Sequence, residues 1–483
     1  MNYIQRKIFS DYRFWTAAVC AVFFTVLCVF NLLKMSIPTE KSYGAASCVF
    51  IYITTFIPFA VIFLCAVTFK VRGRTLIFIG ILLLVSYFIR ILYADFVSKD
   101  YFYFLGPWTE TYRNLTIEEC FKNQVGNYPP LYNYFLILFS RIPLKDMYLI
   151  KVFSLCGEII MYLLATKLVA FIRKEKFSFL LLASLTLIPT FLLNSSQWSQ
   201  CDCFYTACAV GAVYLALKRK SAACFAVLGL GLAFKMQILL IFPAILVFLI
   251  SENGDGKKYL LWRWIWVLPL VFVAASSLPV FFGGSFFKVF KVYFNQVTEG
   301  NSGALNLHCA NILLPFSEIK KGSAAFYALF VLFTLITAFA DIFVIVHTNR
   351  KSGGITDGEK ILLLCLILSF CSVYFMPKMQ DRFFHIPEIF AFIYLAIKRD
   401  KNAFTVAALI ETAQWSVYMK ALLRLPIAYV FSPIFTSFAL FLIFVRAFKY
   451  FPFKKSEKLV RIFDNEPYGK AGQQDSEEVT VAE

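Results

Sequence analysis

The chain has 483 residues, of which 60% are hydrophobic and only 16% are charged, and its mean hydropathy is +0.71. A water-soluble fold of this length cannot bury so much apolar surface, so the composition indicates a polytopic membrane protein and excludes an ordinary soluble domain. The net charge of +18 would suggest nucleic-acid binding in a soluble protein, but here the Lys and Arg residues lie mostly between apolar runs, so we expect no nucleic-acid partner.

Apolar runs recur along the chain and predict an all-α polytopic membrane protein with about 14 transmembrane helices, on the rule of roughly 20 residues per crossing. The runs lie near 14–34, 48–69, 75–94, 148–172, 178–194, 204–217, 221–234, 238–251, 264–282, 323–346, 360–376, 386–397, 402–422 and 425–448. The Lys and Arg between them place both termini in the cytoplasm, provided that Leu131–Ile142 is an interfacial or re-entrant helix on the outer side. The short runs 221–234 and 238–251 suggest half-helices that meet at a polar break.

The same pattern divides the chain into four parts. We predict a two-helix membrane extension over 1–74, a membrane core over 75–400, C-terminal membrane helices over 401–450 and a polar cytoplasmic tail over 451–483. The 13 Cys are scattered and there are only 3 His, so we expect neither a disulfide framework nor a transition-metal site.

Five irregular polar segments fall on the outer side of this topology. They are 95–130, Asn194–Asp202, Lys235–Gln237, Ser285–Gly322 and Pro377–Pro387. No charge rule requires them to share one side, so their coincidence predicts that they converge on a single site above the helical bundle.

The first of these segments contains DYFYFLGPW, from Asp100 to Trp108. A carboxylate just beyond an outward helix suits a general base that takes a proton from an acceptor hydroxyl. The alternative is an interfacial acid that caps a short helix beside an ordinary aromatic belt, and spacing alone favours this alternative. Asp95, slightly nearer the helix end, is the rival acid.

Two further segments carry aromatic and acidic side chains. GNYPPLY holds Tyr128 and Tyr132, which either line a cleft or belong to a plain junction between a loop and a helix. QWSQCDCFY places Asp202 at the top of another span, either as a second acid of the site or as a helix N-terminal acid favoured by the macrodipole.

Cations follow in the next segments. Lys235 in FKMQ interrupts an apolar stretch, and it binds a phosphate, pairs with Asp202, or snorkels outward past a short helix. In MPKMQDRFFHIPE, Arg382 and Lys378 suit the phosphate of a lipid-linked donor, unless the charges of this loop simply neutralise one another.

Amide-rich and sequon-like stretches complete the outer side. The loop Asn295–Asn311 offers amides that suit sugar hydroxyls, although polar outer loops are common. Asn114 and Asn194 each begin a weak glycosylation pattern.

Taken in order, DYxxFLxPW, NYPPLY, QWSQCD, FKMQ and PKMQDRFF resemble the GT-C superfamily of polytopic membrane glycosyltransferases. The branch they resemble is the bacterial relatives of the mannosyltransferase that adds the second mannose of glycosylphosphatidylinositol. The resemblance covers about residues 75–400 and depends on the order of the motifs, because each alone is weak. It implies that a sugar leaves a polyprenyl-phosphate carrier on the non-cytoplasmic face with inversion at the anomeric carbon.

The resemblance also implies roles for the matching residues. Asp100 would be the base and Asp202 the second acid of the catalytic pair. The substrate-binding set would be Trp108, Tyr128, Tyr132, Gln200, Lys235, Gln237, Lys378 and Arg382. Ser199 stands where the family has Gly, and Gln380 and Asp381 stand where it has His-Glu, which puts the donor specificity in doubt more than the reaction class.

We therefore expect a mannosyl-like hexosyltransferase in the cell membrane, with its active site on the extracytoplasmic side. Its partners would be a polyprenyl-phosphate-linked sugar donor, a glycan, lipid or protein acceptor, and the lipid bilayer. No cofactor is expected, because cations can stabilise the departing phosphate, and a divalent metal is compatible but not required. The alternative is a transporter or flippase of lipid-linked sugars, which would need polar residues spread through the membrane depth; a glycan polymerase or ligase would share the topology.

Overall fold

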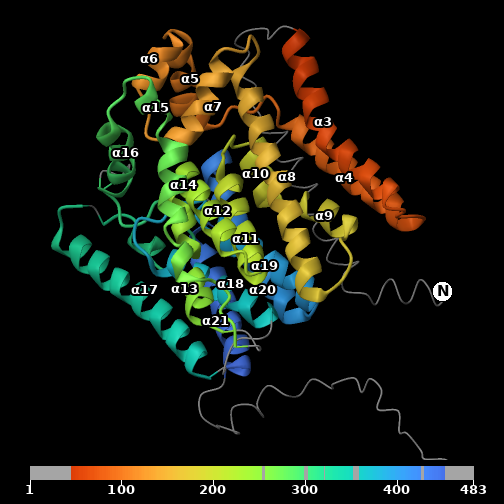
Figure 1. Ribbon diagram of the computed structural model, residues 1–483, viewed down its shortest axis with the longest axis vertical. Helices are drawn as coiled ribbons and strands as arrows, with labels where there is room; N and C mark the ends of the chain where they lie inside the picture. The colour runs from red at the N-terminus through yellow and green to blue at the C-terminus, as the bar shows by residue number, and fades with distance from the viewer. Residues whose placement is uncertain are drawn as a thin grey trace, which may run out of the picture.

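The computed structural model describes residues 45–252, 256–298, 303–319, 321–351, 358–425 and 429–451. Across these ranges the ordered segments are helical, and strand-like pairing is confined to isolated bridges such as that between Leu307 and Gln380 (Figure 1). The helix predicted near 14–34 and almost all of the tail predicted over 451–483 lie outside the described residues.

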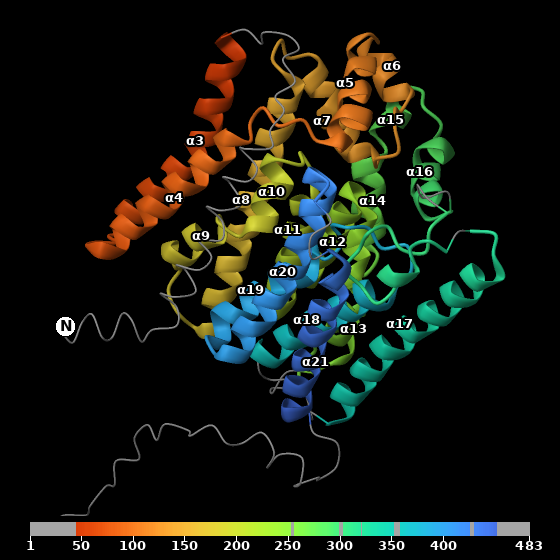
Figure 2. The ribbon, with the colours of Figure 1, turned by 180° about the vertical axis from the view of Figure 1, so that it is seen from behind.

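The helices form a central bundle with smaller helices at one end. The bundle comprises α8 (Asp146–Arg173), α10 (Pro189–Ser196), α11 (Asp202–Leu217), α12 (Ser221–Phe234), α13 (Phe242–Ile250), α14 (Val267–Ser276), α18 (Gly358–Phe375), α19 (His385–Lys398), α20 (Lys401–Leu423) and α21 (Ser432–Tyr450). The end group comprises α5 (Gly106–Arg113), α6 (Ile117–Lys122), α7 (Pro130–Ser140), α15 (Leu278–Phe281) and α16 (Phe286–Thr298). Both ribbon views show α3 (Ala45–Thr68) and α4 (Arg74–Leu92) on one flank and α17 (Ala324–Lys351) on the opposite flank (Figures 1 and 2).

Six helical segments of the described chain are long and apolar enough to cross a membrane. They are α3, α4, α8, α17, α18 and the segment Tyr429–Tyr450 that ends in α21. A seventh crossing is obtained if α9 (Phe179–Leu185) and α10, which are bent by 64° at their junction, count as one span. The structure therefore supports a multi-pass membrane protein, but the predicted count of about 14 crossings is not confirmed.

Several runs that were predicted to cross the membrane form helices shorter than a crossing, and the run that was predicted to be re-entrant is short as well. The run predicted to be re-entrant is α7, whose 11 residues extend about 16 Å and cannot cross a hydrocarbon core of about 30 Å. It begins directly after Pro129, so the GNYPPLY segment contains the junction between a loop and a helix. Its position at the membrane surface stays a prediction, because no bilayer accompanies the chain.

The predicted break between two half-helices is present. Helix α12 ends at Phe234, Lys235 is extended, and a 3-10 turn over Met236–Ile241 leads into α13. The break interrupts the helical hydrogen bonding within an apolar stretch. The Lys235 side chain, described below, starts from this position.

A stack of phenylalanine rings fixes the helix ends that surround this break. Phe135 of α7 lies 4.1 Å from Phe153 of α8, Phe153 lies 4.4 Å from Phe204 of α11, and Phe204 lies 4.9 Å from Phe234 of α12, measured between ring centroids. Gly157 of α8 permits this close approach, because a Cβ there would lie 2.8 Å from the Phe204 ring. The stack therefore holds the segments that carry Asp202 and Lys235.

Candidate active site

A cluster of acids and cations lies where several of these elements end. We define the acid–cation cluster as Asp100, Asp202, Lys235, Asp381 and Arg382. Arg382 is at its centre. The Nη1 atom of Arg382 lies 3.0 Å from Asp100 Oδ2 and 3.6 Å from Asp381 Oδ1. Its Nε atom lies 3.4 Å from Asp202 Oδ2. Four of the five polar segments predicted to converge, 95–130, 194–202, 235–237 and 377–387, therefore meet.

Asp100 stands at the start of a short π-helix, Tyr101–Leu105, an element that is frequent at functional sites. Its Oδ2 accepts hydrogen bonds from Trp198 Nε1 at 3.0 Å and Gln200 Nε2 at 2.8 Å, and it pairs with Arg382. All three contacts fall on the same oxygen. Within the described ranges nothing bonds to Oδ1, and the side chain is 23% exposed, so one carboxylate oxygen is open to a substrate hydroxyl.

Asp202 is placed differently, because both of its oxygens are occupied. Lys235 Nζ donates to Oδ1 at 2.5 Å and Asn194 Nδ2 donates to Oδ2 at 3.1 Å, while the side chain is fully buried. The N-terminus of α11 adds a favourable dipole. Its catalytic role stays a prediction, and the geometry favours a carboxylate that holds Lys235 and Arg382 in place.

Lys235 makes the contact with Asp202 that was one of its predicted alternatives, rather than snorkelling outward. Its Nζ also lies 5.1 Å from the centre of the Tyr128 ring, a cation–π contact. The neighbouring Asp202 carboxylate opposes the cost of burial and raises the pKa of Lys235 above its usual value. The amine therefore stays charged inside the cluster.

Tyr128 and Gln200 connect the aromatic segment to the acid. The Tyr128 hydroxyl donates to Gln200 Oε1 at 2.9 Å, and Gln200 in turn donates to Asp100. The Trp108 ring packs against Tyr128 at 5.4 Å and covers Gly126, whose Cβ, if present, would lie 2.4 Å from the indole. The structure thus brings the predicted Trp108, Tyr128 and Gln200 to one wall of the cluster.

Three other predicted binding residues do not face the cluster in the same way. Tyr132 is fully buried behind Tyr128, and its hydroxyl has no hydrogen-bond partner among the described residues. The Oε1 of Gln237 is likewise buried without a partner in the described chain. Lys378 lies in the neighbouring loop with a positive φ of 59°, and among the described residues its amine forms no ion pair with the acids of the cluster.

The charges of the cluster do not cancel if every acid is ionised, because three carboxylates face two cations. Asp381 accounts for the difference. Burial raises its pKa to about 6, with Arg382 acting in the opposite direction. As pH falls through about 6, the cluster can therefore lose its excess negative charge by taking up one proton at Asp381.

Sequence reasoning missed the residues that orient these groups. Trp198 and Asn194 bond to the two acids, and the Tyr418 hydroxyl accepts from Asn194 at 3.0 Å. Asn194 is only 1% exposed, so the weak glycosylation pattern that begins at this residue does not fit the fold. No periodicity or motif in the sequence links α20, which carries Tyr418, to the site.

The amides predicted to contact sugar hydroxyls are used internally. Asn306 donates to Cys309 O, and Asn311 donates to Val373 O, both at 3.1 Å. Both side chains are buried. Within the described part of the loop, they fix its shape against the end of α18.

Asp95, the rival acid, belongs to another contact. It pairs with Lys145 at 3.0 Å and accepts from the Tyr148 hydroxyl at 2.5 Å. It therefore joins the chain after α4 to the start of α8, and both of these partners lie outside the acid–cation cluster.

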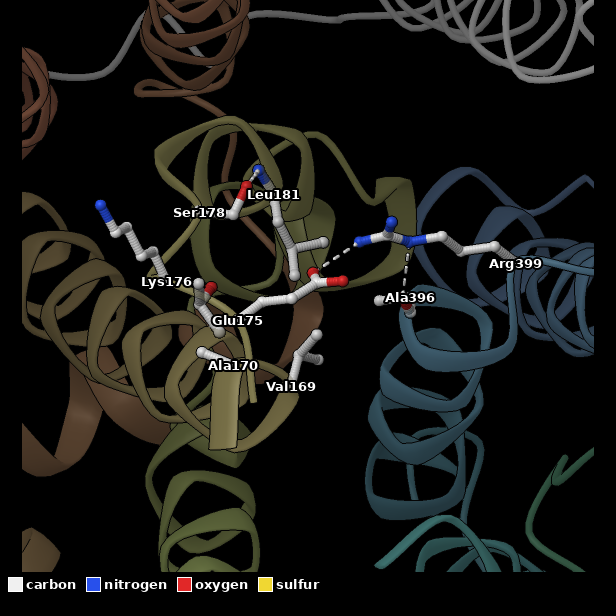
Figure 3. Close-up of a pocket in the computed structure, with 9 residues that line it drawn as sticks. Val169, Ala170, Glu175, Lys176, Ser178, Leu181, Ala396 and Arg399 are labelled. Atoms are coloured by element: carbon white, nitrogen blue, oxygen red, sulfur yellow. Dashed lines mark hydrogen bonds and ion pairs between the residues drawn. The ribbon is translucent and has the colours of Figure 1, made fainter. Parts of the chain in front are cut away.

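A separate cavity of about 100 Å³ lies between α8, the following loop and α19. Figure 3 shows Arg399 bonded to Glu175 at its edge, beside Ser178 and Ala396. None of the site residues lines it, and it is smaller than the several hundred Å³ usual for a ligand pocket. Among the described residues, no group of three or more His, Cys, Asp or Glu is arranged to hold a metal ion.

Comparison with known families gives one match, over residues 200–283, to the family model described as ALG3 protein. This is a mannosyltransferase family. The match supports a membrane glycosyltransferase. It begins at Gln200 and contains Asp202, Lys235 and Gln237, so it covers one side of the acid–cation cluster. Bacterial origin and the link to glycosylphosphatidylinositol are not confirmed by it. No curated protein matches the chain.

Proposed function

We propose that this protein transfers a hexose, mannose-like, from a polyprenyl-phosphate carrier to a glycan, lipid or protein acceptor, with inversion and on the outer face of the membrane. One observation carries the proposal: Asp100 and Arg382, from segments far apart in the sequence, form an ion pair that leaves one Asp100 oxygen open. An acid beside cations is the combination that such a transfer needs. The family match supports the same reaction class.

The acid supplies general-base catalysis. As the acceptor oxygen bonds to the anomeric carbon, its proton passes to Asp100 Oδ1, which is the oxygen without a protein donor. Trp198 and Gln200 hold the other oxygen, so the carboxylate keeps its orientation through the reaction. A positioned base of this kind contributes about 10²–10⁴-fold to the rate.

The cations supply electrostatic stabilisation on the leaving side. The bond between the anomeric carbon and the phosphate oxygen breaks with its electron pair going to the phosphate, while positive charge develops on the sugar. Arg382 lies at the centre of the cluster, where a preorganised cation acts on developing negative charge. The side chain of Asp202 keeps Arg382 and Lys235 together and buried.

A transporter or flippase remains the rival from another class. One observation favours it: buried polar groups also occur deeper in the bundle, where Arg90 pairs with Glu158 and where Thr190 donates to Glu388 at 2.7 Å. Glu158, however, also accepts from the Tyr162 hydroxyl at 2.7 Å, so this polar group is internally satisfied and joins helices α4 and α8. We therefore assign the Arg90–Glu158 pair to packing between α4 and α8.

The deciding experiment presents a panel of purified polyprenyl-phosphate sugars, each with labelled sugar, to membranes that contain the protein. Label that becomes covalently attached to an acceptor supports the transferase. Label that crosses the bilayer while still attached to its carrier, with no transfer from any donor, would replace the transferase by the flippase.

A further inference from the structure

The loop that contains His308 is fastened to the loop that carries Arg382. Lys378 N donates to Leu305 O at 2.7 Å, Leu307 N to Met379 O at 3.0 Å, and Asp381 N to Leu307 O at 3.1 Å. His308 itself forms a bridge with Gln380, two residues before Arg382. The histidine therefore has a fixed position next to the acid–cation cluster.

The backbone of His308 is strained. Eight non-glycine residues of the described chain have a positive φ, and five of these follow helix ends, where this conformation is usual: Lys70, Lys174, Arg219, Arg399 and Arg424. The other three lie in loops around the cluster: Ser199, His308 and Lys378. Such conformations cost about 1–3 kcal/mol each and tend to occur at binding or catalytic sites.

His308 belongs to a second polar cluster, the Lys420 cluster, which we define as His308, Lys420 and Tyr429. The Tyr429 hydroxyl lies 2.8 Å from His308 Nδ1, and Lys420 Nζ lies 3.0 Å from the same nitrogen. Lys420 Nζ also lies 3.6 Å from the centre of the Tyr429 ring. Because Lys can only donate, Nδ1 accepts, and His308 is left with its Nε2–H as an additional donor.

The Lys420 cluster differs from the acid–cation cluster in its charge balance. Arg382 and Lys235 are in direct contact with carboxylates, so they are already paired. Within the described ranges no carboxylate forms an ion pair with Lys420, nor with Lys99, which precedes Asp100 in the sequence. The charged groups that face this cluster from other elements are Lys99, Glu318 and Asp381.

We propose that the Lys420 cluster is an oxyanion subsite that takes a phosphate group beside the loop that carries Arg382. The Lys420 amine and His308 Nε2–H supply the donors, and Lys99 adds long-range attraction. The subsite rests on the proposed transferase and locates a phosphate at cations that form no ion pair with a carboxylate of the described residues, whereas the sequence assigned it to Arg382 and Lys378. The phosphate belongs either to the lipid carrier or to the acceptor.

The test measures binding without sugar transfer, using the purified full chain in detergent. The probes are polyprenyl phosphate, the same polyprenol without phosphate, and inorganic phosphate. Lys420→Met is compared with Lys420→Arg, which keeps the charge. The matched control is Lys218→Met, because Lys218 is an exposed lysine whose Nζ lies 5.0 Å from a Tyr214 ring at another helix end.

We expect Lys420→Met to weaken polyprenyl phosphate binding about tenfold or more, the usual loss for a hydrogen bond between charged groups. Lys420→Arg should recover most of the affinity, and Lys218→Met and the phosphate-free polyprenol should show no effect of the substitution. A loss confined to polyprenyl phosphate assigns the subsite to the carrier. A parallel loss for inorganic phosphate assigns it to phosphate in general, including that of an acceptor.

Unchanged binding of both phosphate probes to Lys420→Met would overturn the subsite. Should that variant fail to fold, Tyr429→Phe removes only the hydroxyl that orients His308 and should weaken binding in the same direction; unchanged binding there would overturn the subsite equally. The proposed function can fail separately. A protein that transfers sugar but loses no phosphate affinity keeps the function without the subsite, and one that binds phosphate through Lys420 without transfer keeps the subsite alone.

Discussion

Replacing Asp100 by Asn separates catalysis from structure, because the geometry of the side chain is nearly conserved. Trp198, Gln200 and Arg382 all contact Oδ2, so the amide oxygen of Asn can take that position and keep these contacts. The amide nitrogen then occupies the place of Oδ1. An amide cannot accept the acceptor's proton, so we expect transfer to slow by about 10²–10⁴-fold, or roughly 3–5 kcal/mol of transition-state stabilisation.

The assay is single-turnover transfer from a polyprenyl-phosphate sugar, measured together with thermal unfolding in detergent. The matched control is Asp95→Asn, because Asp95 is the neighbouring acid and is bound to Lys145 and Tyr148 instead of Arg382. We expect this control to retain transfer within a few-fold. The unfolding temperature of Asp100→Asn should change little, since Asp202 and Asp381 remain beside Arg382.

Two results would refute this reasoning. Transfer by Asp100→Asn within about threefold of the unaltered protein would remove Asp100 as the base, since a base contributes far more than that. An equal loss of transfer rate in Asp100→Asn and Asp95→Asn would show that removing either carboxylate slows transfer. The open oxygen of Asp100 would then have no special role.

Further predictions concern stability and the aromatic wall. Lys235→Met leaves the buried Asp202 carboxylate without its closest cation, so the free energy of unfolding should fall by about 3–5 kcal/mol in chemical denaturation, and adding Asp202→Asn should recover most of the loss. Gly126→Ala forces a Cβ to within 2.4 Å of the Trp108 ring at a φ of 77°, so it should shift the tryptophan fluorescence and lower the unfolding temperature. Burial raises the pKa of Asp381 from 3.8 to about 6, so its contribution to stability is fully present below about pH 4 and is lost as pH rises through about 6. Asp381→Asn should therefore flatten the dependence of the unfolding temperature on pH over this interval.

The Gly126→Ala variant has a matched control in the same chain. Gly73 also has a positive φ, of 64°, but a Cβ there would meet nothing within 4 Å, so Gly73→Ala reports backbone strain alone. If Gly126→Ala lowered the unfolding temperature no more than Gly73→Ala does, the clash with Trp108 would not contribute to the loss of stability. An Asp381→Asn profile that overlays the unaltered one would show that another group titrates.

The all-helical class followed from the sequence, and the pairing with Asp202 was among the alternatives predicted for Lys235, for a definite physical reason. A cation in an apolar stretch needs an anion or water, and few acids in the chain are available to provide it. The break at Lys235 was predicted from the same residue. The convergence of the polar segments was predicted from the topology, which rests on the charges of the other loops. Loop charge indicates the side of the membrane on which a loop lies, but it does not indicate which side chains meet there.

The residues that orient the acids could not be found in this way. Tyr418 and Asn194 reach the site only because α20 packs beside α10, and neither lies in a motif with Asp202. The exposure of individual side chains could not be predicted either. Tyr132 lies four residues from Tyr128 and has the same chemistry, yet Tyr132 is fully buried against the Tyr128 ring. Such differences depend on tertiary packing, which single-sequence patterns do not contain.

The unconfirmed span count and the site have one physical origin. Helices α7, α11 and α12 are shorter than a bilayer crossing, so their ends, rather than continuous walls, meet beside the phenylalanine stack. A helix end carries unpaired backbone groups and a partial charge, and it lets a charged side chain turn out of the apolar bundle. Asp202 begins α11 and Lys235 follows α12, so the polar cluster exists because these helices stop short. Extending α12 through Lys235 would move its amine away from Asp202 and leave that carboxylate buried without its closest cation.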